Sequence, residues 1–587
     1  MTKTGPFHLR LLATSDIHMH VLPYDYRRDA PVAQRGLSGL VDVIAQARAE
    51  AAGGLSVLLD NGDFLQGTPL AETMAAQMDP SPLQQIFAQL RYDAIGLGNH
   101  EFDFGLPYLE RFVRGAPAPV LCSNFPVSGV QSELILERQL AGHPLHIGVL
   151  SVLPPQTAIW NSSHLGHLAP PGDMVAAAQQ HVASLRQRGA DVVVLLAHTG
   201  LAPRGAPEDE NAARALAQIP GIDAMVCGHT HRRLPGPDHH GWPDVDATAG
   251  YVGPVPAVMP GYAASDLGVI DLTLARQDGQ WRAVQGRSAL RTNSGLCDAG
   301  AEGAIAAAHN ATVARQGEVI GHAAQPVQSF FAALQPDVGQ HWVAGAIRAE
   351  VAKALPDAPH PILAAVAPNA VSGRGGPSNY LNLAAGPVLR RHVAAILPYP
   401  NRIWVLQVTG RIARDWAEVS ACFFAQQGPG PAQALVNPAF ASFNFDALFG
   451  LDAVIDPTRP AAFDAAGRRV PGGGRIVSLR FEGQEVTDTQ TFLLGTTSYR
   501  AAGGGGFPGT GAPVLKIDTS VTDALVAYLA AARAIGAAPW RLTTSSPVRA
   551  WIDTSPEAEA HLCDIAARAP HVVARTAEGF LRVEVTV

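Results

Sequence analysis

Short apolar runs alternate with longer segments of helical pattern along the first 275 residues. The apolar runs have the length of strands and lie at Leu9–Ala13, Leu55–Leu59, Ala94–Leu97, Leu145–Leu153, Val192–Ala197, Ala224–Cys227 and Leu267–Leu274. Three Ala-rich segments between them are predicted to be helices: Leu40–Ala52, Leu83–Leu90 and Met174–Arg188. Strands that alternate with helices in this way indicate a layered α/β domain.

The rest of the chain has a mixed pattern that suggests a second domain. Its predicted helices lie near Gln340–Lys353 and Gly386–Leu397, and its predicted strands at Ile403–Val408 and Phe492–Thr497. Between the two parts, residues 298–316 have the pattern of a helix that an aspartate opens and Gly317 ends. We therefore expect a first domain over residues 1–290, a linker helix within 291–318, and a second domain over 319–587.

Composition and charge exclude several classes of protein. Apolar residues make up 47% of the chain and charged residues 16%, which argues against a disordered chain. The net charge of −8 has the wrong sign for a protein that binds a nucleic-acid polymer, so we expect none as a partner. No apolar stretch reaches 18 residues, so no membrane span is expected.

The five cysteines never occur as C-x-x-C, which excludes a zinc knuckle and a disulfide framework. No secretory signal precedes the first strand, which favours a cytoplasmic location.

Side chains that bind metals directly follow five of the predicted strands. They are Asp16, His18, Asp63, Asn99, His198, His229 and His231. Ligand sites of open α/β sheets lie beyond the carboxyl ends of the strands, so these five ends could converge on one crevice. Imidazoles, carboxylates and an amide, without a thiolate, suit Zn, Mn, Fe, Co or Ni better than a structural Cys-rich zinc site. Seven ligands exceed the needs of one ion and suit two ions, roughly 3.5–4 Å apart, that share a carboxylate.

A single histidine after an apolar run is more often a core residue than a metal ligand. The ordered series of D-I-H, N-G-D, G-N-H-E-F-D, A-H-T-G and G-H-T-H is far harder to obtain by chance. Together these motifs resemble the calcineurin-like metallophosphoesterase domain. Four later segments resemble the nucleoside-binding domain of the branch formed by 5′-nucleotidases and 2′,3′-cyclic-nucleotide 2′-phosphodiesterase/3′-nucleotidases: Ser372–Tyr380, Tyr399–Gly410, Phe443–Gly450 and Thr496–Gly509. The segment Tyr24–Tyr26 resembles the cyclic-phosphodiesterase subgroup. The similarity runs from about Leu9 to Leu529, and residues from Trp540 onward lie outside it.

The resemblance implies a fold and a role for each motif. The fold is a layered β-sandwich flanked by helices, joined by a helix to a C-terminal α/β nucleoside-binding domain. One divalent ion would take Asp16, His18, Asp63 and His231, and the other Asp63, Asn99, His198 and His229, with Asp63 as the bridge. His100 would lie beside the scissile phosphate, and Asp103 would orient it. Relatives are typically periplasmic, which is the alternative to the cytoplasm.

The implied reaction is the hydrolysis of 2′,3′-cyclic nucleotides to 3′-nucleotides and the removal of the 3′-phosphate to leave nucleosides. A 5′-nucleotidase or nucleotide-sugar hydrolase on the same scaffold is the first alternative, and a non-catalytic nucleotide-binding protein is the second.

For the substrate's base we expect an aromatic clamp made by Tyr499 and Phe445, with Phe443 as the alternative to Phe445. Arg374 and Asn369 are candidates for contacts to the substrate's phosphate or ribose, since an Arg fork suits phosphate oxygens. Arg402 and Arg500 are expected to be solvated.

Overall fold

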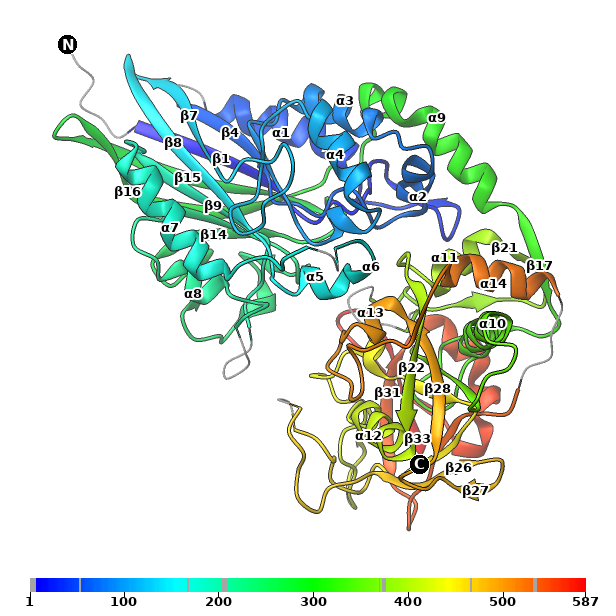
Figure 1. Cartoon of the computed structure of the whole chain (residues 1–587). Helices are drawn as coiled ribbons and strands as arrows, with labels where there is room; N and C mark the ends of the chain where they lie inside the picture. Colours follow the sequence, from blue (N-terminus) through cyan, green and yellow to red (C-terminus); the bar gives the residue numbers. More distant parts are fainter. Residues whose placement is uncertain are drawn as a thin grey trace. The chain divides into compact units, whose positions relative to one another are not determined.

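The computed structural model describes residues 7–51, 54–165, 168–202, 208–368, 370–371, 376–464, 467–531 and 536–587. The chain divides into two compact units, Met1–Arg315 and Gln316–Val587 (Figure 1). Each unit has its own hydrophobic cores. Of the helices in these ranges, none combines the length and the apolar character that a membrane span requires.

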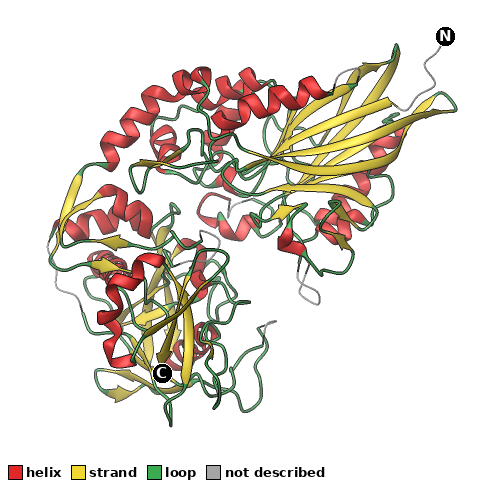
Figure 2. Ribbon diagram, turned by 180° about the vertical axis from the view of Figure 1, so that it is seen from behind, coloured by secondary structure: helices red, strands yellow, loops and turns green. Residues whose placement is uncertain are grey.

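Two sheets form the centre of unit 1 (Figure 2). The first has the strand order β16-β15-β1-β4-β5-β6 and the second β12-β13-β14-β10-β9-β8-β7, with β11 pairing with β14. The strands of the first sheet are β1 (Phe7–Thr14), β4 (Leu55–Asp60), β5 (Ala94–Gly96), β6 (Val120–Leu121), β15 (Asp266–Gln277) and β16 (Gln280–Thr292). Those of the second are β7 (Glu133–Leu140), β8 (His143–Val152), β9 (Val192–Ala197), β10 (Ala224–Cys227), β11 (Arg233–Leu234), β12 (Val245–Asp246), β13 (Tyr251–Val252) and β14 (Val255–Pro260). Parallel pairing joins β1, β4, β5 and β6, and likewise β8, β9, β10 and β14.

The alternation of side chains along the strands divides the core of unit 1 into layers. In β1, Leu9, Leu11 and Ala13 belong to the core between the two sheets, whereas Leu12 belongs to the core on the outer side of the first sheet. That outer core also contains residues of α1 (Val41–Glu50), α2 (Pro69–Ala76), α3 (Ser81–Leu90), α4 (Leu106–Gly115) and α9 (Ala299–Gln316). The outer face of the second sheet packs against α7 (Met174–Gln187) and α8 (Ala213–Ala217) (Figure 1). The layered β-sandwich flanked by helices is therefore confirmed.

The helix α9 packs as part of unit 1. Asp298 caps it by accepting a hydrogen bond from the backbone N–H of Ala301 at 2.8 Å. Ala301 and Ile305 are buried in the core, and the Thr312 hydroxyl bonds that of Thr73 at 2.9 Å. The helix thus contributes its own apolar face to unit 1, and the boundary between the units follows Arg315.

Unit 2 contains a five-stranded sheet of order β24-β19-β28-β22-β29 and two four-stranded sheets, β27-β26-β25-β30 and β23-β31-β33-β32. The five-stranded sheet is made of β19 (Ile362–Val366), β22 (Arg402–Thr409), β24 (Ala447–Phe449), β28 (Thr491–Thr497) and β29 (Leu515–Ser520). The four-stranded sheets use β25 (Asp452–Ile455), β26 (Ile476–Phe481), β27 (Gln484–Glu485) and β30 (Trp540–Leu542), and β23 (Gln433–Ala434), β31 (Arg549–Thr554), β32 (His571–Arg575) and β33 (Leu581–Thr586). The longer helices are α10 (Val338–Ala354), α12 (Gly410–Ala421) and α14 (Val521–Ala530).

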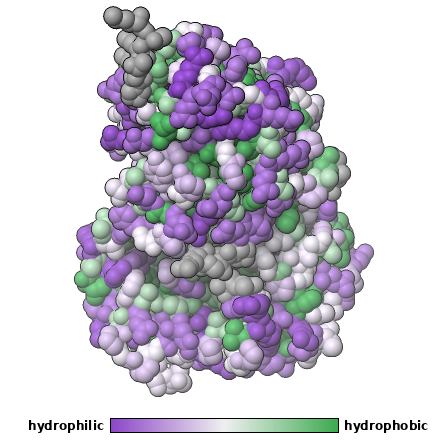
Figure 3. Space-filling view, turned by 90° about the vertical axis from the view of Figure 1, so that its left-hand side faces the viewer, coloured by the Kyte–Doolittle hydropathy of each residue, from purple (hydrophilic) through white to green (hydrophobic). Residues whose placement is uncertain are grey.

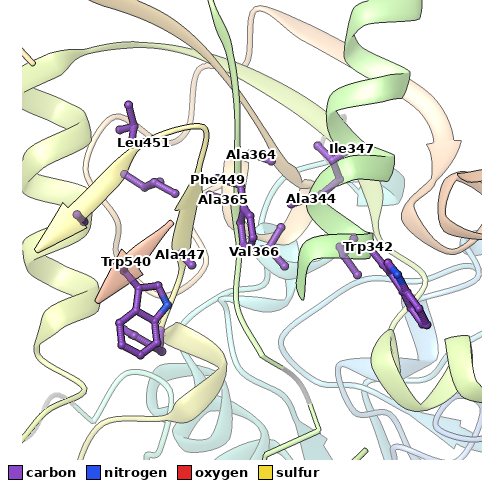
Figure 4. Packing of buried hydrophobic residues seen from close by; sticks show 14 of the residues in the cluster. Trp342, Ala344, Ile347, Ala364, Ala365, Val366, Ala447, Phe449, Leu451 and Trp540 are labelled. Atoms are coloured by element: carbon purple, nitrogen blue, oxygen red, sulfur yellow. The ribbon is translucent and has the colours of Figure 1, made fainter. Parts of the chain in front are cut away.

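The core of unit 2 forms between these sheets and helices. Figure 4 shows Ile347 of α10 on the side of the helix toward the strand that carries Ala364, and Trp342 of the same helix farther from that strand. Phe449 pairs with Ala364 on the neighbouring strand. The four-stranded sheets bring Trp540 into the same core, so residues 540–587 complete this unit. The face seen in Figure 3 is mostly hydrophilic, with hydrophobic residues scattered over it.

One predicted helix of unit 2 is shorter than expected. Within Gly386–Leu397, residues Gly386–Leu389 form the strand β21, which pairs with β17 (Val319–Ala323), and only Arg390–Ile396 form the helix α11. Pro387 disfavours helical backbone at Gly386, and the pairing of Gly386–Leu389 with β17 keeps the backbone extended up to Leu389.

Candidate metal centre

The loops after β1, β4, β5, β9 and β10 bring the predicted ligands of unit 1 together. Two groups in the described part of the chain have ligand atoms within 4.8 Å of one another: Asp16, His18 and His231, and Asp63, His198 and His229. His18 Nε2 lies 3.0 Å from His231 Nε2, and His198 Nε2 lies 3.0 Å from Asp63 Oδ2. Asp63 Oδ2 is also 3.6 Å from His18 Nε2, so this carboxylate faces both groups. The two groups could each hold a metal ion.

Asn99 joins the second group. Its Oδ1 lies 2.9 Å from Nδ1 of His229. All seven predicted ligands therefore meet at the carboxyl ends of the strands, as the positions of the motifs predict.

The chemistry of these side chains fits a pair of divalent cations. Asp63 Oδ2 and His198 Nε2 are buried 3.0 Å apart, and among the described residues neither atom has another hydrogen-bond partner. Nδ1 of His18 and Nδ1 of His198 each lie within 2.9 Å of a backbone carbonyl, which only accepts, so both rings carry a proton on Nδ1 and direct Nε2 toward the group. Burial lowers the pKa of His18 to about 3, so its imidazole is neutral, which is the form that binds metals. Buried carboxylates without counter-charge are costly, and cations at this place would offset that cost.

The backbone is strained at five of the ligands. Asp16, His18, Asp63, His229 and His231 all have φ between 48° and 66°. This region is sparsely populated by residues other than glycine and costs on the order of 1–3 kcal/mol for each residue. Backbone hydrogen bonds between the ligand loops maintain it: the N–H of Asp16 donates to the Gly62 carbonyl at 3.0 Å, and that of His18 donates to the Asp63 carbonyl at 2.8 Å.

Two glycines of the motifs are required by close packing around the ligands. A Cβ on Gly98 would lie 2.3 Å from Asp63 Oδ1 and 2.6 Å from His198 Cε1. A Cβ on Gly228 would lie 2.6 Å from Asp16 Oδ2. Any larger residue at these positions would displace a ligand, which explains the G-N-H and G-H-T-H patterns.

Glu101 holds two of the ligand loops together, a role that the sequence did not reveal. Its buried carboxylate accepts hydrogen bonds at 2.7–3.1 Å from the backbone N–H groups of Asp63, Phe64, Leu65 and Gly98. Burial and the neighbouring Asp63 charge raise the pKa of Glu101 to about 7, against the opposing effect of these donors. The feature of the sequence that could have drawn attention to Glu101 is its place directly after Asn99 and His100 in the G-N-H-E-F-D motif.

We expect Glu101→Ala to destabilise unit 1 by roughly 4 kcal/mol, because four backbone donors would lose their acceptor in a buried place. Calorimetry of the full chain measures this as a lower melting temperature of the unit 1 transition. Glu302→Ala, on the exposed side of α9, is the matched control and should leave the transition within about 0.5 kcal/mol of the wild type. An equal effect of the two substitutions would contradict the assigned role.

His100 lies next to both groups and is paired with Asp103. The His100 Nδ1 is 2.8 Å from Asp103 Oδ2, and the His100 backbone N–H donates to Asp63 Oδ1 at 2.8 Å. Burial lowers the pKa of His100, but the carboxylates of Asp103 and Asp63 outweigh it and raise the pKa to about 9. The His100 side chain is 20% exposed, so it is accessible from solvent.

The residues predicted to bind the substrate's base have different environments in unit 2. Phe445 is 1% exposed and stacks on Phe423 with ring centroids 4.7 Å apart, so its assignment to a base clamp was wrong. The alternative, Phe443, is 47% exposed. Tyr499 is half-buried on the short helix α13 (Ser498–Ala501). Asn369 and Arg374 lie outside the described residues.

Arg500 is buried rather than solvated. Its Nε lies 2.9 Å from Asp446 Oδ2, and its Nη2 donates to the carbonyl oxygen of Phe443 at 2.8 Å. The guanidinium also lies 4.2 Å from the Phe507 ring centroid. Arg500 therefore ties the loop that carries Phe443 to the helix that carries Tyr499.

Comparisons with known proteins agree with this architecture. Residues 9–233 match the calcineurin-like phosphoesterase family, and residues 319–511 match the 5′-nucleotidase C-terminal domain. A Haemophilus influenzae 2′,3′-cyclic-nucleotide 2′-phosphodiesterase/3′-nucleotidase is 35% identical over 86% of this chain and 81% of its own length. The protein of the same name from Salmonella typhimurium is 33% identical over 86% of this chain and 82% of its own. A solved Staphylococcus aureus structure has a TM-score of 0.72 at 22% identity, covering 91% of this chain and 99% of that one.

The fold and the site thus define a phosphoesterase of the calcineurin-like class, which is a class of hydrolases. Within that class, the chain belongs to the family that joins this domain to a 5′-nucleotidase C-terminal domain and that includes the 2′,3′-cyclic-nucleotide 2′-phosphodiesterase/3′-nucleotidases.

Proposed function

We propose that this chain hydrolyses 2′,3′-cyclic nucleotides to 3′-nucleotides and removes the phosphate of 3′-nucleotides to leave nucleosides. The observation that carries the proposal is the convergence of seven N and O ligands in two groups next to His100. The two relatives named above, which match 86% of the chain, bear the name of this activity. The donor set suits two divalent ions among Zn, Mn, Co, Fe and Ni.

The candidate site residues have separate roles in the proposed hydrolysis. Asp16, His18, Asp63 and His231 would hold one ion, and Asp63, Asn99, His198 and His229 the other. Such a pair of ions supplies Lewis acidity, which activates a water molecule and offsets charge on the phosphoryl oxygens. His100, held through Nδ1 by Asp103, presents its cationic ring to the phosphoryl group and stabilises the charge that develops there. When the ester bond breaks, Nε2 of His100 gives its proton to the departing ribose oxygen.

The proposal is tested by phosphate release from 3′-AMP, from 5′-AMP, and from 2′,3′-cAMP after its ring is opened, with Mn²⁺ or Co²⁺ added. We expect kcat/KM for 3′-AMP and for ring opening of 2′,3′-cAMP to exceed that for 5′-AMP at least about tenfold, roughly 1.4 kcal/mol of discrimination. Dominant activity on 5′-AMP would establish the 5′-nucleotidase alternative, and no turnover of any substrate would establish a binding protein.

For the base we propose a clamp of Phe443 and Tyr499. We expect Phe443→Ala to raise KM for 3′-AMP about tenfold with little change in melting temperature, because stacking on a base contributes roughly 1–3 kcal/mol. Phe445→Ala is the matched control. Since Phe445 is a core residue, its removal should cost about 3–5 kcal/mol of stability, measured as a lower melting temperature of unit 2. A KM unchanged in Phe443→Ala would contradict the clamp.

A further inference from the structure

The ligands of the second group are contacted by residues that lie outside the sequence motifs. His18 and His198 direct Nδ1 to the backbone carbonyls of Gln66 and Asn61, at 2.9 and 2.8 Å. His229 differs: its Nε2 lies 3.1 Å from the Oε1 of Glu210, a side-chain carboxylate. An ionised carboxylate only accepts hydrogen bonds, so the contact with Glu210 places a proton on Nε2 of His229, and Nδ1 lies 2.9 Å from Asn99 Oδ1, the other ligand atom of this group.

Glu210 is held in place by residues next to the site. Its backbone carbonyl accepts a hydrogen bond from the Thr199 hydroxyl at 2.6 Å, and Thr199 directly follows the candidate ligand His198. The same hydroxyl accepts from the N–H of Ala212 at 2.9 Å. The neighbouring Asp209 accepts from the side-chain amide of Gln156 at 2.7 Å. Hydrogen bonds therefore hold the backbone of Glu210 and the residues on either side of it, Asp209 and Ala212.

The segment that contains the helix α5 (Thr157–Trp160) supports the same two ligands from another side. The Trp160 ring stacks on that of His229, with centroids 5.3 Å apart and planes 16° from parallel. The side-chain amide of Asn161 donates to the backbone carbonyl of Asn99 at 2.9 Å. Glu210, Trp160 and Asn161 thus contact His229 and Asn99, which belong to the second group and not to the first.

We infer that Glu210, with Trp160 and Asn161, positions the ligands of the second cation site and sets the affinity of that site alone, an inference that rests on the two-cation centre of the proposed function. The carboxylate selects the His229 tautomer in which Nδ1 can donate to a cation, and its charge makes the imidazole a stronger donor. Trp160 restricts the rotation of the ring. These residues are positioning residues, since none of them is a ligand in either group.

The test measures Mn²⁺ binding to the full chain by calorimetry after removal of metals, in the wild type, Glu210→Gln and Trp160→Ala. Outer partners of a metal-binding histidine typically change the affinity 10–100-fold. We expect a weakening of that size in one of the two binding steps and a change below threefold in the other. Glu208→Gln, two residues away on the same segment, is the matched control and should leave both steps unchanged.

A His231→Ala background removes a ligand of the first group and leaves the second group complete. Adding Glu210→Gln to that background should weaken the remaining ion by the same factor as in the wild type. The inference is overturned if Glu210→Gln weakens both steps equally or neither, while the wild type binds two ions and turns over substrate. A wild type that binds fewer than two Mn²⁺ ions would overturn the proposed function and the inference together.

Discussion

The Asp63→Asn variant is expected to lose at least about 10³-fold in kcat and to bind fewer than two metal ions for each chain. The Asp63 carboxylate faces both ligand groups, with Oδ2 3.0 Å from His198 Nε2 and 3.6 Å from His18 Nε2. An amide has the same shape but no charge, so two cations held close together would lose their shared counter-charge. Elemental analysis of the folded variant and its steady-state turnover of 3′-AMP measure both effects.

Asp42→Asn is the control for this substitution, because Asp42 is an exposed aspartate in the first turn of α1. It should retain two ions and full activity. If Asp63→Asn bound two ions with wild-type affinity, the bridging role would be wrong, whatever its turnover.

The His100→Ala variant is expected to retain two ions and its melting temperature while kcat falls roughly 10²–10⁴-fold. Proton transfer by a positioned side chain contributes a factor of this size. His100 is no member of either ligand group, so its removal leaves the candidate ligands in place. Single-turnover measurements on 3′-AMP separate the chemical step from product release. His240→Ala, an exposed histidine of the same unit, is the control.

Asp103→Asn removes the negative charge from the His100–Asp103 pair and keeps the shape of the side chain. The Asp103 carboxylate is one of the groups that raise the pKa of His100, so its loss lowers that pKa. The cationic form of His100 then disappears at a lower pH, and we expect the alkaline limb of the kcat profile to move toward acid while kcat falls about tenfold. A kcat within threefold of the wild type in His100→Ala would exclude His100 from the chemistry.

Much of unit 1 could be predicted because its strands and helices follow from the residue pattern within each segment. The apolar runs predicted as strands, such as Leu9–Ala13 and Val192–Ala197, lie within β1 and β9. Short apolar strands between Ala-rich helices leave few alternatives to a layered α/β fold. The convergence of the ligands follows from topology, since parallel strands end at the same edge of a sheet.

Some side chains have roles that depend on contacts between distant segments, and only the tertiary structure decided those roles. Phe443 and Phe445 are two residues apart in one motif, yet the first is exposed and the second is packed against Phe423 and Trp540. Trp540 belongs to a strand that no motif covers, so sequence alone had no means of choosing between the two phenylalanines. The buried position of Arg500 likewise depends on Asp446, more than fifty residues earlier.

By itself, the sequence determined the layered fold of unit 1 and the strand ends that carry the seven candidate ligands, because both depend on periodicity and on residues placed directly after strands. The reaction class followed from the resemblance of these motifs to a known family. Only the tertiary structure decided which polar side chains support that centre. Glu101 and Glu210 act through backbone donors and a ring nitrogen that lie on other segments of the chain, so their roles depend on contacts that form only on folding.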